Sequence, residues 1–270
     1  MDQVSAHGYA WGYIGSCVPF VASILLILNA GALGIGSVKA TMLAFLMNAV
    51  WWGCMSVPLL KSYRQRLAPE ADGGEGTLKS LGRTLGEIRK NPRVFWFLLA
   101  FFFYIDGVYT IIDLATSYGK DMGISDTSLM LALLLTQVVA FPCSILFGTL
   151  AKKLESGKLI RISILGYLGI VLFALQLDKA WEFWFLAVCV AVFQGGIQAL
   201  SRSYFTRIIP SEKAAEYFGF YDIFGKGAAF MGTLLVGAAS QITGSSRNGV
   251  GLLAILFLAG FFLFRKADRA

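Results

Sequence analysis

Five polar side chains recur at helical spacing inside one apolar stretch, Arg93 to Lys120. Positions i, i+3, i+4, i+7 and i+11 fall on one face of an α-helix. Carboxylates and hydroxyl groups on one such face can carry a proton or bind a polar solute, because together they supply acceptors and donors. The five residues are Asp106, Tyr109, Thr110, Asp113 and Ser117.

Depth in the bilayer separates the two carboxylates of this face. A helix that enters the membrane at Arg93 places Asp106 about 20 Å along its axis, near the midplane, and Asp113 about 10 Å further, close to the opposite interface. A carboxylate at the helix centre costs about 2.5 to 3.5 kcal/mol on insertion scales. We therefore expect Asp106 to be the proton-coupling residue; the alternative is a carboxylate that bonds a neighbouring helix for packing.

A second polar face lies near the end of a later apolar stretch. Gln194, Gln198 and Arg202 follow one another at i, i+4 and i+8, and Gly195 and Gly196 leave room for a neighbouring helix or a ligand. The glutamine amides can donate to a substrate and accept from it, and the alternative is hydrogen bonding between helices. For Arg202 the alternative is snorkelling to the lipid headgroups.

Two further segments complete the candidate residues. Asp222 and Lys226 are four residues apart and can pair along a helix, which predicts either a gate or a static pair. Gln137 lies near the centre of a segment that Pro142 is expected to kink. The candidates for substrate binding or proton coupling are Asp106, Tyr109, Thr110, Gln137, Gln194 and Gln198, and those for gating or structural charge are Asp113, Arg202, Asp222 and Lys226.

The composition predicts an integral membrane protein. The chain of 270 residues is 57% hydrophobic and 14% charged, with a mean hydropathy of +0.68, whereas soluble domains are about 25% charged. The net charge of +7 does not indicate nucleic-acid binding, because the basic residues lie in loops between apolar segments. The four cysteines form no CxxC pair, His7 is the only histidine, and no nucleophile has a base at fixed spacing. We therefore expect no catalytic residue, no metal and no cofactor.

Eight apolar segments of about 20 residues predict an all-α, polytopic membrane protein. When these spans alternate across the membrane, 19 of the 23 Lys and Arg residues fall on one side. Such a bias marks the cytoplasmic side and places both termini there. The predicted spans are Tyr9–Leu28, Lys39–Leu60, Arg93–Thr116, Ser128–Leu150, Leu159–Leu177, Trp181–Leu200, Tyr217–Ser240 and Gly249–Phe264.

The longest connection runs from Lys61 to Pro92. It contains a Gly-rich turn over residues 69–76, followed by a segment with Thr77 as its cap. We expect a short helix lying on the inner membrane surface; the alternative is a solvated loop helix. The apolar residues on one face of this helix are Leu78, Leu81, Leu85 and Ile88.

Three motifs resemble the vacuole-effluxer-like branch of the major facilitator superfamily, in the form of bacterial relatives of the fungal autophagy-linked vacuolar amino-acid effluxer. They are YIDGVYTIIDLATSYGKDMGIS, LLLTQVVAFPCSILFGTLAKKL and GGIQALSRSYFTRIIPSEKAAEYFGFYDIFGKG. The resemblance covers nearly the whole chain from Gly8 onward. One departure lies in GTLAKKLESGK, residues 148–158, where Lys152 and Lys153 stand at positions that are usually Asp and Arg in the superfamily's loop motif. Loss of the acidic residue weakens the expectation of the usual charge latch at that loop.

The resemblance implies an organisation of twelve spans in two six-helix bundles. The eight spans look like the fifth to the twelfth, so residues 1–60 correspond to the last two helices of the N-terminal bundle. Residues 61–92 correspond to the central cytoplasmic loop, and residues 93–270 to a complete C-terminal six-helix bundle. The first four spans are expected to be missing, with Met1 as an internal start or a fragment boundary.

The resemblance also implies a function. It implies a secondary active transporter that moves a small solute, amino acids by family expectation, by alternating access with proton coupling. Its partners are then the solute, protons and the lipid bilayer, with no nucleic acid, and its location is the cytoplasmic membrane of a bacterium or, alternatively, a vacuolar membrane. The alternative function is a truncated, non-transporting membrane protein, either a fragment or a scaffold. The sequence carries no signal for oligomeric state.

Overall fold

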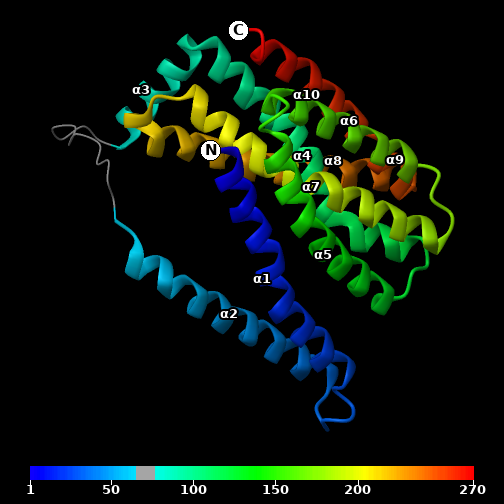
Figure 1. The fold of residues 1–270 in the computed structure, drawn as a ribbon. Helices are drawn as coiled ribbons and strands as arrows, with labels where there is room; N and C mark the ends of the chain where they lie inside the picture. The colour runs from blue at the N-terminus through cyan, green and yellow to red at the C-terminus, as the bar shows by residue number, and fades with distance from the viewer. Residues whose placement is uncertain (65–76) are drawn as a thin grey trace.

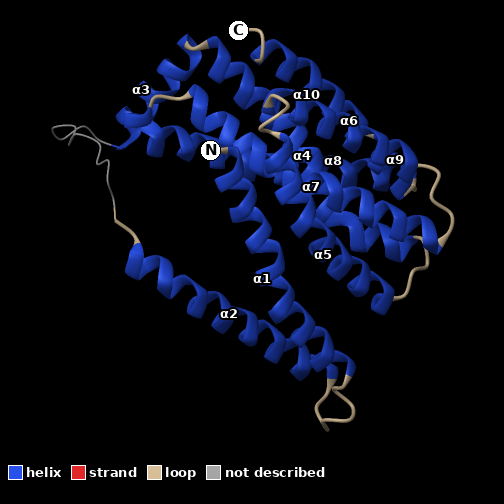
Figure 2. Cartoon of the chain, viewed as in Figure 1, coloured by secondary structure: helices blue, strands red, loops and turns tan. Residues whose placement is uncertain are grey.

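A computed structural model describes residues 1–64 and 77–270, and within these ranges the secondary structure is helical, without a strand (Figure 2). The Gly-rich turn predicted over residues 69–76 lies outside the described residues, as do the side chains of Thr77 and Leu78. The helices are α1 (Asp2–Leu28), α2 (Ser37–Ser62), α3 (Thr77–Lys90), α4 (Pro92–Asp121), α5 (Asp126–Leu150), α6 (Ser156–Ala174), α7 (Ala180–Ile208), η1 (Ser211–Lys213), α8 (Ala214–Thr243), α9 (Ser246–Gly251) and α10 (Leu253–Ala267).

The described residues include 8 segments that are long and apolar enough to cross a membrane, which confirms the predicted spans. Most helices extend a few residues beyond the predicted apolar limits, because backbone hydrogen bonding does not stop where the apolar sequence ends. The last span differs in kind. It was predicted as one helix over Gly249–Phe264, but it divides into α9 and α10 at Leu252. Gly249 and Gly251 precede the break, and glycine is a poor helix former.

The last six spans, α4 to α8 and the α9–α10 pair, pack into one bundle (Figure 1). Its core is aromatic on the side where α4, α7 and α8 meet. Phe97 stacks on Phe205 with a centroid distance of 5.4 Å, and Phe101 stacks on Tyr221 at 4.1 Å. These rings bury large apolar areas between helices and so fix how the three helices pack.

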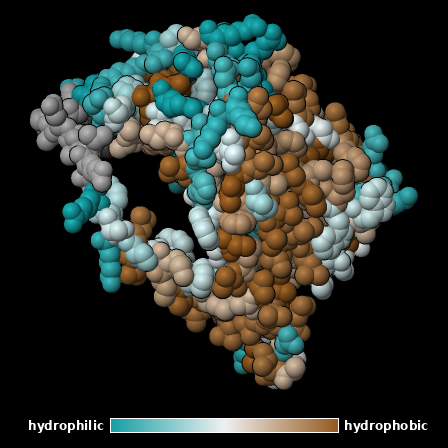
Figure 3. Space-filling model, in the orientation of Figure 1, coloured by the Kyte–Doolittle hydropathy of each residue, from teal (hydrophilic) through white to brown (hydrophobic). Residues whose placement is uncertain are grey.

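The bundle has two polar ends separated by an apolar belt (Figure 3). We call them the α3 end, which carries α3 and the C-terminus, and the α9 end (Figure 1). At the α9 end, Arg247 pairs with Asp178 and donates to the Leu177 carbonyl at 2.7 Å. At the α3 end, Arg161 pairs with Asp268 at 3.3 Å. This layering matches a protein that spans a bilayer.

The first two spans lie outside the six-span bundle (Figure 1). Helix α1 packs on α5 and α7, where Gly148 leaves room for Ala6. The Asp2 carboxylate pairs with Arg207 at 2.9 Å, and the Ser5 hydroxyl donates to the Ala199 carbonyl at 2.8 Å. Helix α2 packs mainly on α1 and stands apart from the bundle, and the space between them is open in the space-filling view (Figure 3).

The amphipathic segment forms the predicted helix, α3, which packs against α4 and α8. Ile88 is buried, whereas Leu81 and Leu85 are 40% and 43% exposed. The Lys213 ammonium donates to Glu87 at 2.6 Å, which ties α3 to the start of α8. The exposed leucines leave an apolar face open, as the predicted position on the membrane surface requires.

Candidate functional site

Two chambers meet at one pair of glutamines, Gln137 on α5 and Gln194 on α7. The polar chamber lies between α1, α5 and α7 toward the α3 end and encloses about 1320 Å³, its open mouth included. Both glutamines also line a second chamber toward the α9 end. The walls of the polar chamber are Met1, Val4, Ser5, Gly8, Tyr9, Gly12, Tyr13, Ser16, Gln137, Gln194, Gln198, Arg202, Ser203 and Thr206.

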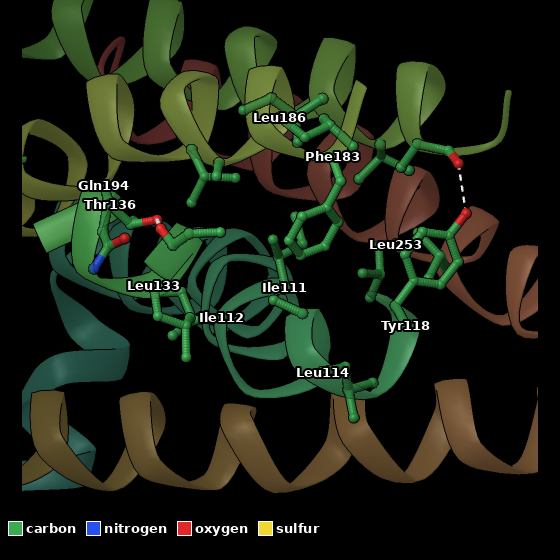
Figure 4. Close-up of a pocket in the computed structure, with 18 of the residues that line it drawn as sticks. Ile111, Ile112, Leu114, Tyr118, Leu133, Thr136, Phe183, Leu186, Gln194 and Leu253 are labelled. Carbon is green, nitrogen blue, oxygen red and sulfur yellow. Dashed lines mark hydrogen bonds between the residues drawn. The ribbon is translucent and has the colours of Figure 1, made fainter. Parts of the chain in front are cut away.

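The apolar chamber lies between α4, α5, α6, α7 and the α9–α10 pair, and its empty space is about 920 Å³, its open mouth included. Gln194 and Thr136 lie at one end of it and Tyr118 at the other, with aliphatic and aromatic side chains between them (Figure 4). The Tyr118 hydroxyl donates to the Ala174 carbonyl at 2.6 Å (Figure 4). The remaining wall residues are Ile111, Ile112, Leu114, Ala115, Ala132, Leu133, Gln137, Ile170, Val171, Ala174, Phe183, Leu186, Ala187, Val190, Val250 and Leu253.

Two glycines set the position of Gln194. A side chain on Gly195 would collide with Ser144, and one on Gly196 would collide with Phe147, both of which are on α5. The close approach predicted for this glycine pair brings α5 against α7. The approach brings the buried Gln194 side chain, 5% exposed, to the junction with Gln137.

Several buried oxygen atoms at this junction have no hydrogen-bond partner among the described residues. They are Tyr13 Oη, Gln137 Oε1 and Gln194 Oε1. The Tyr13 hydroxyl approaches the Gln194 amide, but the two groups do not reach hydrogen-bond geometry. The large majority of buried polar atoms in folded proteins are hydrogen-bonded. Three unpaired oxygens in one place therefore indicate a site that water or a polar solute fills.

The Asp106 carboxylate lies elsewhere, sealed between α4 and α8. It is 0% exposed and lines neither chamber. Its Oδ1 accepts from the Gly232 amide at 2.8 Å and from the Thr110 hydroxyl at 3.3 Å, while Oδ2 has no partner among the described residues. Thr110 is also 0% exposed. The structure therefore separates Asp106 and Thr110 from the glutamines with which the sequence grouped them.

The other three residues of this polar face, Tyr109, Asp113 and Ser117, have different surroundings, and Ser117 is exposed. Tyr109 is half-buried, and its hydroxyl lies within electrostatic reach of Tyr9, Asp222 and Asp113. Asp113 is exposed. The face predicted from helical spacing thus divides into a buried part, where Asp106 and Thr110 lie against Gly232 of α8, and a part that is half-buried or exposed.

The predicted charges of α7 and α8 are also placed. Arg202 lines the polar chamber, with its guanidinium carbon 5.3 Å from the centroid of the Phe218 ring. Asp222 and Lys226 are both exposed, and no ion pair joins them. The helical spacing permitted that pair, but spacing alone does not select the rotamers that close it.

The sequence analysis missed two tyrosines of α1 in the polar chamber. Tyr9 and Tyr13 face Gln194 and Arg202 across the chamber. A signal was present: Ser5, Tyr9, Tyr13 and Ser16 recur at helical spacing and give the first span a polar face of its own.

Comparisons with known proteins agree with this architecture. A model of the family described as "Vacuole effluxer Atg22 like" matches residues 1–269. An uncharacterized MFS-type transporter of Bacillus subtilis, YxiO, is 45% identical over 267 residues, which are 97% of this chain and 62% of that protein. Autophagy-related protein 22 of Yarrowia lipolytica is 25% identical over 98% of this chain and 50% of its own length. The chain thus spans between half and two thirds of these relatives.

Solved structures show the same fold. A crystal structure of a variant of the E. coli fucose:proton symporter, FucP, matches 86% of this chain and 56% of its own, with a TM-score of 0.63 and 13% identity. A bacterial homologue of the iron transporter ferroportin, in an outward-facing state, matches 100% of this chain and 65% of its own, with a TM-score of 0.66 and 17% identity. The predicted fold, all-α with eight spans and of the major facilitator type, is confirmed. None of these proteins is described as an enzyme.

Proposed function

Because the chain belongs to the vacuole effluxer Atg22-like family, we propose that it acts in secondary transport of a small solute by alternating access. The observation that carries this proposal is the junction at Gln137 and Gln194. Chambers on its two sides approach from opposite ends of the spans, and the unpaired oxygens lie where they meet. A solute site near the middle of the spans, between helices that can rock, is what alternating access requires.

We propose amino acids as the solute on the basis of the family, and protons as the coupling ion. Asp106 supports the coupling, because it is a carboxylate buried between two helices with one oxygen unpaired. Proton uptake would change its bonds to α8 at Gly232 without contact to the solute. Coupling would then act through the α4–α8 contact, and not through the chamber wall.

The proposal includes a topology. The α3 end carries Arg93, Arg161 and Arg207, and an excess of basic residues marks the cytoplasmic side. We place both termini there, in the cytoplasmic membrane of a bacterium. We further assign α1 and α2 to an N-terminal bundle, because they pack outside the six-span bundle.

The test is transport by the purified chain in liposomes, with a panel of radiolabelled amino acids and sugars. We expect protein-dependent uptake of at least one amino acid, accelerated by an inward proton gradient. Asp106→Asn should abolish that acceleration and retain exchange of labelled for unlabelled solute. Asp126→Asn, a substitution in the exposed pair with Lys120 at the α9 end, should change neither. Equal acceleration in Asp106→Asn and the wild type would remove Asp106 from the mechanism.

A non-transporting membrane protein is the second candidate. The position of α2 favours it, because this helix packs mainly on α1 and leaves large apolar side chains such as Phe45 and Trp52 exposed. Such a surface suits assembly with another membrane protein. Absence of uptake for every solute of the panel, by chain that is folded in the same liposomes, would support this candidate over transport.

A further inference from the structure

We propose that Arg202 binds an anionic group of the transported solute, a carboxylate, so that the polar chamber selects solutes that carry a carboxylate over solutes that lack one. The inference rests on the proposed transport function and names the solute class of that site. It departs from the two roles that the sequence suggested for Arg202, snorkelling and gating.

Charge in the polar chamber is the first observation. Among the described residues that line it, Arg202 carries the one charged side chain; the others are apolar residues, glycines, hydroxyls and amides. Asp106 is sealed against α8, and Asp113 is not part of the chamber wall. Asp222 lies within electrostatic reach of Tyr9 but forms no ion pair with Arg202. The α-amino group of Met1 is also cationic and belongs to the same wall, and a chamber whose charged groups are cationic favours an anion in a membrane.

Three other arginines near helix ends pair with carboxylates of the chain. Arg207 pairs with Asp2 at 2.9 Å, Arg161 pairs with Asp268 at 3.3 Å, and Arg247 pairs with Asp178. Within the described part of the chain Arg202 lacks such a carboxylate, although it lies only five residues from Arg207 on the same helix. The planar guanidinium is suited to bidentate bonds with a carboxylate, which a solute can supply.

The orientation of Arg202 is the second observation. Side chains of a helix lean toward its N-terminus, and α7 begins at the α9 end. The Cα–Cβ bond of Arg202 therefore tilts toward Gln198, and its side chain forms part of the chamber wall. Its guanidinium lies over the Phe218 ring, 5.3 Å from the centroid, and an aromatic face holds a cation in place.

The rest of the site fits a carboxylate joined to an apolar body. Gln198 and then Gln194 follow Arg202 at one-turn intervals toward the junction, over about 12 Å of helix axis. Beyond the junction, the apolar chamber presents Ile111, Leu133 and Phe183 (Figure 4). A small organic acid would place its carboxylate at Arg202 and direct its apolar part toward the second chamber.

Binding to the purified, full chain in a neutral detergent tests the inference. Three probes share an apolar body and differ in charge: 4-methylpentanoate, 4-methylpentanamide and 3-methylbutylamine. Isothermal titration calorimetry should give at least about tenfold tighter binding for 4-methylpentanoate than for the other two, because a charge-assisted bidentate pair is lost with them.

Two variants locate the effect. Arg202→Gln should weaken 4-methylpentanoate to the affinity of the amide and leave the amide unchanged, while Arg202→Lys should retain part of the difference. Arg265→Gln, which removes an exposed cation of the α3 end outside both chambers, should change nothing. Thermal denaturation of each variant without ligand checks that it is folded. Arg202→Glu provides a second test, because a carboxylate at this position should bind 3-methylbutylamine more tightly than 4-methylpentanoate.

Several outcomes would overturn the inference. Equal affinity for the acid and the amide, no binding of the acid, or equal losses in Arg202→Gln and Arg265→Gln would each do so. Arg202-dependent binding of phosphatidylglycerol added to the micelles, with no binding of 4-methylpentanoate, would identify the anion as a lipid headgroup and reject a solute. Liposome uptake of another solute can still be observed after any of these results, so the transport proposal is tested separately.

Discussion

Two buried polar sites in the same bundle behave in opposite ways. At the α4–α8 contact, the Asp106 carboxylate accepts from the Gly232 amide and the Thr110 hydroxyl, and it lines neither chamber. At the α5–α7 contact, the Gln137 and Gln194 amides border two chambers and leave their oxygens unpaired. Both contacts look alike in sequence, because each is a polar residue within an apolar span. Their partners, and not their polarity, separate a site that joins helices from a site that receives a solute.

The glycine opposite Asp106 gives the largest expected effect. A Cβ atom at Gly232 would collide with the Asp106 carboxylate and the Thr110 hydroxyl, whereas one at Gly237 would meet nothing within 4 Å. We expect Gly232→Ala to lower the free energy of unfolding by about 2 to 4 kcal/mol, from steric overlap and a weakened hydrogen bond. Gly237→Ala is the control and should be neutral or stabilise by about 0.5 to 1 kcal/mol, as helix propensity predicts.

Thermal denaturation of the two glycine variants in the same detergent measures this difference. If both midpoints moved together, α8 would not be held against Asp106, and the carboxylate would not be a joint between helices. The α4–α8 contact would then no longer contrast with the α5–α7 contact as a site that joins helices.

A paired hydroxyl gives an intermediate effect. Tyr104 and Ser201 share a buried hydrogen bond of 2.7 Å between α4 and α7. Ser201→Ala should cost about 1 to 2 kcal/mol, because it leaves the Tyr104 hydroxyl buried and unpaired. Adding Tyr104→Phe should recover part of that loss, since both polar partners are then gone. A double-mutant cycle on thermal or denaturant unfolding checks this, and additive losses would show that the two groups do not interact.

The sequence predicts the membrane spans, but it does not predict most of the contacts that the polar residues inside them make. Hydropathy places all eight spans, since the bilayer imposes length and apolarity on each segment alone. Helical spacing identifies Gln194 and Gln198 as one face for the same local reason. The seal over Asp106 depends on how α4 and α8 register at Gly232, which is a tertiary fact that no local pattern carries. Tyr9 and Tyr13 were not predicted, although their helical spacing with Ser5 and Ser16 marks a polar face.

Unpaired groups at the junction give the smallest expected effect on stability. Tyr13 and Tyr104 are a matched pair, because both are tyrosines largely removed from solvent but only the Tyr104 hydroxyl has a partner among the described residues. Tyr104→Phe should destabilise by about 1 kcal/mol, whereas Tyr13→Phe should be neutral, since the lost hydroxyl makes no hydrogen bond to lose. Gln194→Leu should likewise be neutral or stabilising by up to about 1 kcal/mol. Each variant is measured by its thermal midpoint without ligand.

The small change in stability at Gln194 is informative when it is measured together with the change in solute binding. A residue that serves packing loses stability when it is truncated, whereas a residue kept for a solute loses binding and leaves stability unchanged or improved. Gln194→Leu should therefore abolish solute-induced stabilisation while its own midpoint holds or rises. A large fall in the midpoint would mean that Gln194 joins α5 to α7, as Asp106 joins α4 to α8, and the two contacts would then be of one kind.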